Sequence, residues 1–197
     1  MIRAEDRLEN PVTGELLIFH RTSEQTGGES VLVETIVEPD GFVAAAHVHP
    51  HQSERFEVIA GEVGFRIGTQ EILAGPGDVA VVPPGTPHRF WNAGRAEARF
   101  LCEVRPALEF ESLIETMFTL AAEGKTNRKG LPNPLRLAVV ARAHFDTVQL
   151  PFPPAAVQRA ALALAAPVGR MLGYHPHARP DRTYDRGRPH ESSRAQR

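Results

Sequence analysis

The chain has 197 residues, a mass of 21.6 kDa and 42% hydrophobic residues, which is enough for one well-packed core. Its formal net charge of −2 gives no reason to expect a nucleic acid or an anionic membrane as a partner. The single cysteine, Cys102, excludes an intrachain disulfide and suits a reducing cytoplasm, which is where we expect the protein. No apolar run resembles a signal peptide, and none reaches the ~20 residues of a membrane span.

The N-terminal part of the chain predicts short strands after a polar arm. Residues 1–10 are polar and predict the arm, and residues 15–20 predict the first strand. The polar, glycine-containing segment 21–30 predicts a loop. Residues 31–37 alternate well enough for a second strand, which ends at the turn sequence Pro39-Asp40-Gly41.

The stretch from residue 41 to residue 61 combines a β-type composition with side chains that bind metals. His47 and His49 lie two residues apart, so in an extended segment both imidazoles point to the same side. Pro50 interrupts this strand, and Glu54 opens the returning one. Alternation on the returning strand predicts an inward and an outward set, namely Glu54, Phe56 and Val58 against Arg55 and Glu57. Two imidazoles and a carboxylate then converge at one end of a β structure.

A second stretch, residues 77–92, supplies a further histidine. Residues 79–82 are apolar and predict a buried strand, which ends at the turn sequence Pro83-Pro84-Gly85. His88 opens the next strand, and the alternation places Phe90 on the same side as His88. This histidine is the fourth candidate metal ligand.

Further strands are predicted at residues 63–67, 71–73 and 98–104, and the closely spaced turn signals favour an all-β barrel or sandwich.

The last strand has two alternating faces, one with Phe100, Cys102 and Val104 and one with Leu101, Glu103 and Arg105. The sequence leaves open which set faces inward. Glu103 and Arg105 are candidates to orient a polar substrate if they face inward; the alternative is an outer, salt-bridged face.

After residue 106 the spacing of apolar residues becomes helical. Three helices are predicted, the first near residues 110–121, the second from Asn133 as N-cap to about 146, and the third near 154–172. We expect some of their apolar residues to be buried against the β structure or across a dimer interface, namely Phe110, Leu113, Met117, Leu164 and Val168. Residues 174–197 are rich in Arg, His, Pro and Ser and predict a disordered tail. The predicted division is therefore 1–106, 107–173 and 174–197, in a homodimer.

Both histidine-containing stretches resemble the two sequence motifs of the cupin superfamily. The matching positions are Gly41, His47, His49, Glu54 and Gly61 in the first motif, and Gly77, Pro83, Gly85, His88 and Asn92 in the second. The resemblance implies a mainly β protein with a jelly-roll barrel (a double-stranded β-helix) from about residue 12 to about residue 106. It also implies one divalent metal ion, held by His47, His49, Glu54 and His88. The helical extension is similar to that of bacterial cupin-domain proteins. His51 matches no motif ligand, and we expect it to be a solvated turn residue.

Three imidazoles and one carboxylate suit Fe, Mn, Ni, Zn or Cu, and the sequence does not choose among these metals. If the alternation holds, the site lies inside the barrel among five pocket residues, namely Val43, Ala45, Phe56, Phe65 and Phe90. Their side chains favour an apolar or aromatic small molecule as substrate or ligand.

Two functions follow from this site. One is a metal-dependent enzyme, of oxygenase or isomerase type, that acts on a small organic substrate in the barrel; four protein ligands on a six-coordinate metal leave two positions for it. The alternative is a non-catalytic protein that binds or senses a small molecule in the same pocket. The sequence assigns no catalytic residue beyond the metal ligands.

Overall fold

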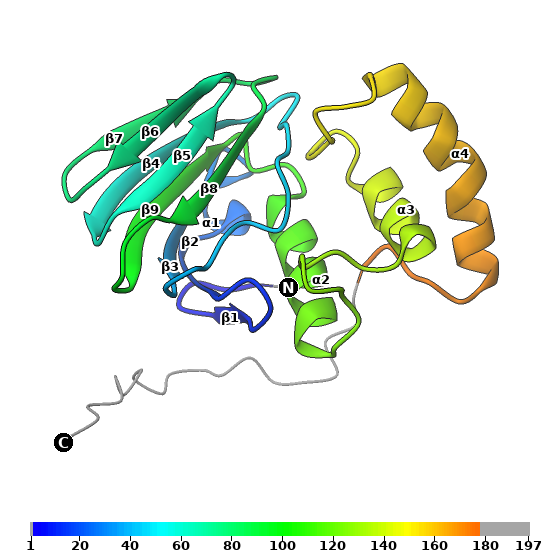
Figure 1. The fold of residues 1–197 in the computed structure, drawn as a ribbon. Coiled ribbons are helices and arrows are strands. Elements are labelled where there is room, and N and C mark those ends of the chain that lie inside the picture. Colours follow the sequence, from blue (N-terminus) through cyan, green and yellow to red (C-terminus); the bar gives the residue numbers. More distant parts are fainter. Residues whose placement is uncertain (1, 178–197) are drawn as a thin grey trace.

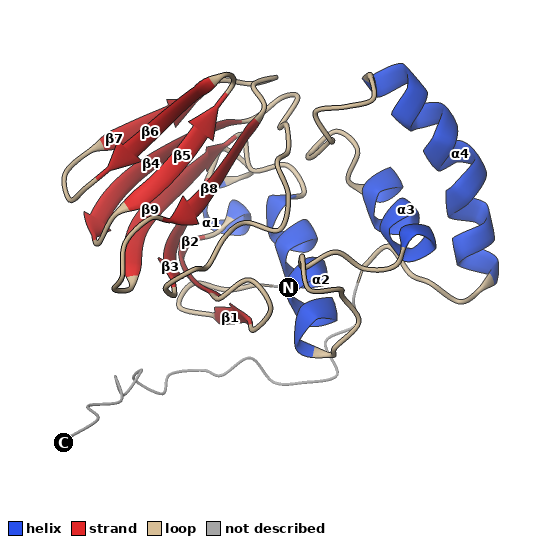
Figure 2. Ribbon diagram, in the orientation of Figure 1, coloured by secondary structure: helices blue, strands red, loops and turns tan. Residues whose placement is uncertain are grey.

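A computed structural model describes residues 2–177, in which nine strands form two antiparallel sheets and four helices accompany them (Figure 1, Figure 2). The strands are β1 (Arg7–Asn10), β2 (Glu15–Arg21), β3 (Val31–Val37), β4 (Ser53–Ala60), β5 (Val63–Ile67), β6 (Gln70–Ala74), β7 (Val79–Val82), β8 (His88–Asn92) and β9 (Ala98–Arg105). The helices are α1 (Ser23–Thr26), α2 (Phe110–Ala122), α3 (Pro134–Ala143) and α4 (Ala155–Met171). The protein is therefore mainly β, and three helices follow the last strand as predicted.

The strands pair in the orders β1-β2-β3-β9-β4-β7 and β6-β5-β8. Residues 41–49, predicted as a strand, pair only through isolated bridges, among them Phe42 with Trp91 and His47 with His88. The predicted jelly-roll barrel therefore consists of two separate sheets. Within the described residues, the backbone hydrogen bonds do not join these sheets into a closed ring. The core between the sheets is aromatic.

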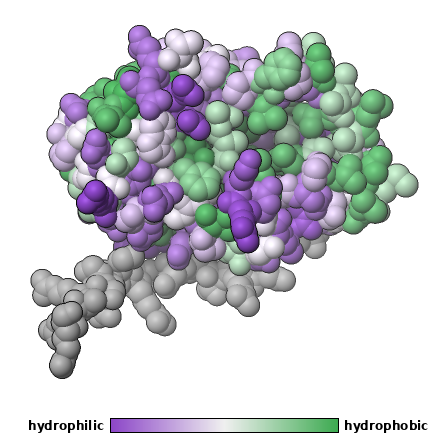
Figure 3. All heavy atoms as spheres, viewed as in Figure 1, coloured by the Kyte–Doolittle hydropathy of each residue, from purple (hydrophilic) through white to green (hydrophobic). Residues whose placement is uncertain are grey.

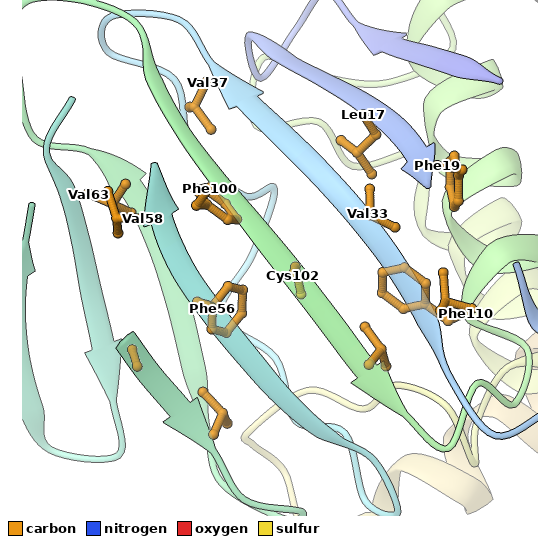
Figure 4. Close-up of a cluster of buried hydrophobic side chains, with 14 of the residues drawn as sticks. Leu17, Phe19, Val33, Val37, Phe56, Val58, Val63, Phe100, Cys102 and Phe110 are labelled. Atoms are coloured by element: carbon orange, nitrogen blue, oxygen red, sulfur yellow. The ribbon is translucent and has the colours of Figure 1, made fainter. Parts of the chain in front are cut away.

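Four phenylalanines fill the space between the two sheets. Phe56 and Phe100 come from the large sheet, and Phe65 and Phe90 come from the small one. The ring centroids of Phe56 and Phe65 lie 5.1 Å apart, as do those of Phe90 and Phe100, which suits edge-to-face or tilted aromatic packing. Figure 4 shows Phe56, Phe100 and Cys102 on neighbouring strands of the large sheet, all on its inner face.

Two predictions about the N-terminal part are wrong. The polar arm contains β1, which pairs with β2 and buries Leu8 and Asn10. The loop at residues 21–30 contains the one-turn helix α1, whose N-cap Thr22 accepts a hydrogen bond from the backbone of Gln25. Both elements are only four residues long, so the sequence contains too few residues to show a periodic pattern that would predict them.

The strand predicted as buried at residues 79–82 is buried on one face only. Val79 and Val81 are 49% and 56% exposed, whereas Ala80 and Val82 are buried. Successive side chains of a strand point to opposite faces of the sheet, so Ala80 and Val82 face the core while Val79 and Val81 face the solvent.

The last strand resolves the choice between its two faces. Phe100, Cys102 and Val104 are buried on the inner face. Glu103 forms ion pairs with Arg21 and, at 2.9 Å, with Arg105. The salt-bridged outer face is therefore the correct alternative, and Glu103 and Arg105 do not face the pocket.

The C-terminal helices pack in two ways. Phe110 and Leu113 of α2 are buried, and Met117 is partly buried against the core, as predicted. Leu164 and Val168 of α4 are 78% and 47% exposed, so the prediction that they pack against the β structure is wrong. Figure 3 shows apolar surface over α4. The burial of Leu164 and Val168 across a dimer interface stays a prediction.

The contact between α3 and α4 depends on Gly169. A Cβ atom at this position would lie 2.6 Å from the backbone oxygen of Leu135 and 2.7 Å from a methyl carbon of Val139. We expect Gly169→Ala to lower the free energy of unfolding by about 1–3 kcal/mol, because the clash involves backbone and outweighs the gain in helix propensity. Chemical denaturation measures this change; an unchanged or raised midpoint would contradict the packing described here.

No helix within residues 2–177 is long and apolar enough to span a membrane. The first residues of the predicted tail are described: Tyr174 stacks with Arg136 at 4.5 Å, and His177 lies 2.9 Å from the hydroxyl oxygen of Ser112. The rest of the predicted disordered tail, residues 178–197, lies outside the described residues.

Candidate metal centre and its chamber

The four predicted metal ligands lie together at one end of the sheets. His47 and His49 come from the loop before β4, Glu54 from the start of β4, and His88 from the start of β8. One donor atom from each of the four side chains lies within 4.8 Å of all the others. His49, Glu54 and His88 are buried, and His47 is partly exposed. The structure therefore brings together four groups from two motifs that are separate in sequence.

All three imidazoles have the same orientation. The Nδ1 atom of His47 lies 2.9 Å from the carbonyl oxygen of Ala45, and that of His88 lies 3.0 Å from the oxygen of Thr86. The Nδ1 atom of His49 lies 2.6 Å from the oxygen of Thr147. Because a carbonyl oxygen only accepts hydrogen bonds, each Nδ1 carries the proton. A neutral ring then presents the lone pair of Nε2 to the site, which is the arrangement of a metal-bound histidine.

The atoms that face one another across the site lack other hydrogen-bond partners. Nε2 of His49 is buried and makes no hydrogen bond within residues 2–177, and the buried atoms Nε2 of His88 and Oε2 of Glu54 have only each other. Nε2 of His88 lies 2.6 Å from Oε2 of Glu54, and Nε2 of His49 lies 3.5 Å from Oε1. Lone pairs at such short distances repel unless a proton or a cation lies between them. The residues present therefore fit a divalent metal ion.

Burial and neighbouring charges set the protonation of the site. Burial and the adjacent imidazoles lower the pKa of His47 to about 3, so this ring is neutral at pH 7. Burial alone would raise the pKa of Glu54, but the three histidines lower it to about 2, so the carboxylate is ionised. Burial would lower the pKa of His88, but its contact with Glu54 raises it. A proton on His88 occupies the place that a metal ion would take.

The segment between α3 and α4 completes the site, which no pattern in the sequence predicts. Thr147 supplies the carbonyl oxygen that fixes His49, and Gln149 pairs with Val48 through two backbone hydrogen bonds of 2.8 Å. Phe110 of α2 lies beside the same histidine, with ring centroids 6.4 Å apart. The helical extension therefore orients a candidate metal ligand from a distance of 98 residues along the chain.

A chamber of about 420 Å³ opens from the candidate metal ligands into the space between the large sheet and the helices. His47, His49 and Glu54 line it, together with four of the five predicted pocket residues, namely Val43, Ala45, Phe56 and Phe90. Phe65 lies behind Phe56 in the core and is not among the lining residues. The opposite wall comes from the helical extension, including Leu113, Met117, Leu137, Val140 and Phe145. The chamber therefore extends from the β sheets to the helical extension, and its lining is mostly apolar.

One carboxyl group of the chamber lies outside the metal site. Glu15 of β2 is 5% exposed, and its Oε2 accepts a 2.6 Å hydrogen bond from the hydroxyl of Thr13. Burial raises the pKa of Glu15 to about 7, and the bond from Thr13 offsets this only in part.

This raised pKa predicts a pH-dependent stability. The folded state holds the Glu15 proton up to about pH 7, whereas the unfolded chain releases it near pH 4.5, so stability falls as the pH rises between these values. The difference between the pKa values of Glu15 in the folded and unfolded states corresponds to roughly 3 kcal/mol in the free energy of unfolding. We expect Glu15→Gln to remove this part of the decline between pH 4.5 and pH 8, measured by urea denaturation. Parallel stability curves for the variant and the wild type would contradict it.

Comparison with known proteins identifies the domain that carries the site. The family model described as "Cupin domain" matches residues 33–104, which include all four candidate ligands. A stretch of 45 residues is 47% identical to oxidoreductase OpS7 of Beauveria bassiana; it covers 22% of this chain and only 15% of that protein.

Solved structures also resemble the chain. A predicted oxalate decarboxylase from Thermotoga maritima is 19% identical, with a TM-score of 0.47, and the match covers 54% of this chain and 98% of that one. A protein with a double-stranded β-helix domain from Klebsiella pneumoniae is 27% identical, with a TM-score of 0.44, and the match covers 53% of this chain and 85% of that one.

Proposed function

This chain belongs to the cupin superfamily, and we propose that it is a metal-dependent enzyme, of oxygenase or isomerase type, acting on a small organic substrate in the chamber. The observation that carries the proposal is the set of buried donor atoms on His49, Glu54 and His88, which face one another at one end of an apolar cavity. A structural metal site would instead be closed by protein on all sides. Here His47, His49 and Glu54 line the cavity itself.

His47, His49, Glu54 and His88 would hold the metal ion. When bound, such an ion supplies Lewis-acid or redox chemistry and a template for substrate oxygens. The remaining residues of the chamber bind and orient the substrate. Phe56, Phe90 and Phe145 exclude water from the cavity and offer apolar contact area. Cys102 lies 3.9 Å from Glu54, and burial raises the pKa of its thiol well above the usual value, so it contributes a neutral side chain.

The test of this proposal has two steps. The first is metal analysis of the protein as purified, for which we expect one divalent ion per chain. The second is a search for oxygen uptake or product formation with phenolic, enolic and thiol substrates, with the metal-depleted protein as control. Turnover that disappears on chelation and returns with one metal supports an enzyme.

The alternative is a non-catalytic cupin that binds or senses the same kind of molecule. The apolar chamber is compatible with this alternative, because a cavity of this kind can hold a ligand whether or not a reaction follows. Such a protein would bind its ligand with measurable affinity and give no product on long incubation. That outcome, with metal present at full occupancy, would replace the enzymatic proposal.

A further inference from the structure

The chamber contains a group of polar side chains, Asn10, Glu15 and Thr35, which we name the polar corner. All three line the cavity, and they are 2%, 5% and 4% exposed. Asn10 pairs with Glu15 between β1 and β2, and Thr35 of β3 pairs with Leu17, the next inward residue of β2. The three side chains therefore form one patch on the inner face of the large sheet.

The polar corner lies far from the metal ligands along the sheet. Glu54 is level with Val104 of β9, which pairs with Val31 of β3. Glu15 is level with Val37 of the same strand β3. From residue 31 to residue 37 the strand rises by roughly 20 Å, at about 3.3 Å per residue. The metal ligands and the polar corner thus lie toward opposite ends of one chamber.

The polar corner has hydrogen-bonding groups that the protein does not use. Oδ1 of Asn10 accepts from the backbone nitrogens of Val12 and Thr13, and one oxygen of Glu15 accepts from Thr13. These bonds hold the turn between β1 and β2. Within residues 2–177, the amide nitrogen of Asn10, the hydroxyl of Thr35 and the second oxygen of Glu15 make no hydrogen bond. None of these three groups belongs to the fully buried atoms without a partner, so each is open to the chamber, where water or the oxygen of a ligand can pair with it.

We propose that the polar corner binds a neutral oxygen of the substrate, so that the substrate is an elongated, mostly apolar molecule with oxygen functions toward both ends. One oxygen function lies at the metal ligands, and a hydroxyl or carbonyl lies at Asn10, Glu15 and Thr35. The metal end of this inference rests on the proposed function; the polar corner does not. No Lys or Arg is among the described residues that line the chamber, so an anion at Glu15 would have no counter-charge. Burial raises the pKa of Glu15 to about 7, so at neutral pH about half of these carboxyl groups are protonated and can donate a hydrogen bond to a neutral oxygen.

The probes that test this inference are a homologous series of saturated fatty acids and their ω-hydroxy and ω-amino derivatives. Calorimetry on the purified protein measures the affinity of each compound. At the length that fits best, we expect the ω-hydroxy acid to bind about tenfold more tightly than its parent acid, as one satisfied buried hydrogen bond allows. Parent acids that bind more tightly at every length, tightest binding of the ω-amino acid, or no binding in the series would each overturn the inference.

Variants separate ligand binding from a structural role. Thr35→Val removes the hydroxyl at constant shape, and Glu15→Leu removes the carboxyl; we expect each to abolish the preference for the ω-hydroxy acid. The matched control is Glu34→Gln, because Glu34 is equally buried on β3 but contacts His20 and Arg99 instead of the chamber. A merely structural role would lower the unfolding midpoint in Thr35→Val and leave the preference unchanged, which would overturn the inference.

Metal content, measured on the same samples, distinguishes the two proposals. A preserved ω-hydroxyl preference in a protein that binds no metal would contradict the proposed function alone. Full metal occupancy without this preference would contradict the polar corner alone.

Discussion

Replacement of His49 or Glu54 by alanine is expected to weaken metal binding by at least about 100-fold and to abolish turnover, while the fold stays intact. Loss of a residue that only supports a ligand costs 10–100-fold in metal affinity, so loss of a ligand itself costs more. The fold survives because the aromatic core around Phe56 and Phe100 does not involve these two side chains. Competition with a chromophoric chelator measures the affinity, and circular dichroism monitors the fold.

The matched control is His51→Ala. His51 lies in the same turn but is exposed, and it does not belong to the cluster of candidate ligands. We expect this variant to bind metal and turn over as the wild type does. Equal metal affinity in His49→Ala and His51→Ala would show that the imidazole cluster is not the binding site.

Phe110→Ala is expected to lower the free energy of unfolding by about 3–5 kcal/mol, the cost of removing a buried aromatic side chain. Phe110 is 7% exposed, belongs to the main core cluster and lies beside His49. Its loss opens a cavity between α2 and the large sheet and removes one support of the metal site. Urea denaturation measures the stability, and the chelator competition shows whether metal affinity falls as well.

Phe152→Ala is the matched control, because Phe152 is 78% exposed. We expect it to change the stability by no more than about 0.5 kcal/mol.

A related expectation concerns the fragment without residue 107 onward, which exposes the apolar wall of the chamber and should aggregate. A soluble fragment that unfolds cooperatively would show that the helices are a separate appendage.

The cluster of candidate metal ligands is predictable from the sequence because the information is local. The His-x-His spacing, the return of the chain to Glu54 and the turn before His88 fix which side chains share a face. The same alternation predicted the buried positions of β4, where Glu54, Phe56 and Val58 point inward. The sequence also predicts Asn133 as an N-cap, and the structure confirms it, because its side chain accepts a hydrogen bond from the backbone of Arg136.

The rest of the chamber was not predictable because it depends on long-range contacts. Nothing near Thr147 in the sequence indicates that its carbonyl oxygen meets His49. Residues 15–20 predict a strand, but nothing in their pattern places Glu15 at the site, because charged residues are mostly exposed. Helical spacing places Leu164 on an apolar stripe, but it does not show which surface this stripe packs against. In the single chain Leu164 is exposed.

X-ray absorption spectroscopy at the metal edge of the purified protein tests the central claim most directly. The structure predicts a first coordination shell of nitrogen and oxygen at about 2.0–2.2 Å, with outer-shell scattering from three imidazole rings. In His49→Ala the metal content should fall, and any metal that stays bound should show scattering from fewer imidazole rings, whereas His51→Ala should match the wild type. A wild-type spectrum without histidine scattering, or one that His49→Ala leaves unchanged, would contradict a metal centre built from His47, His49, Glu54 and His88.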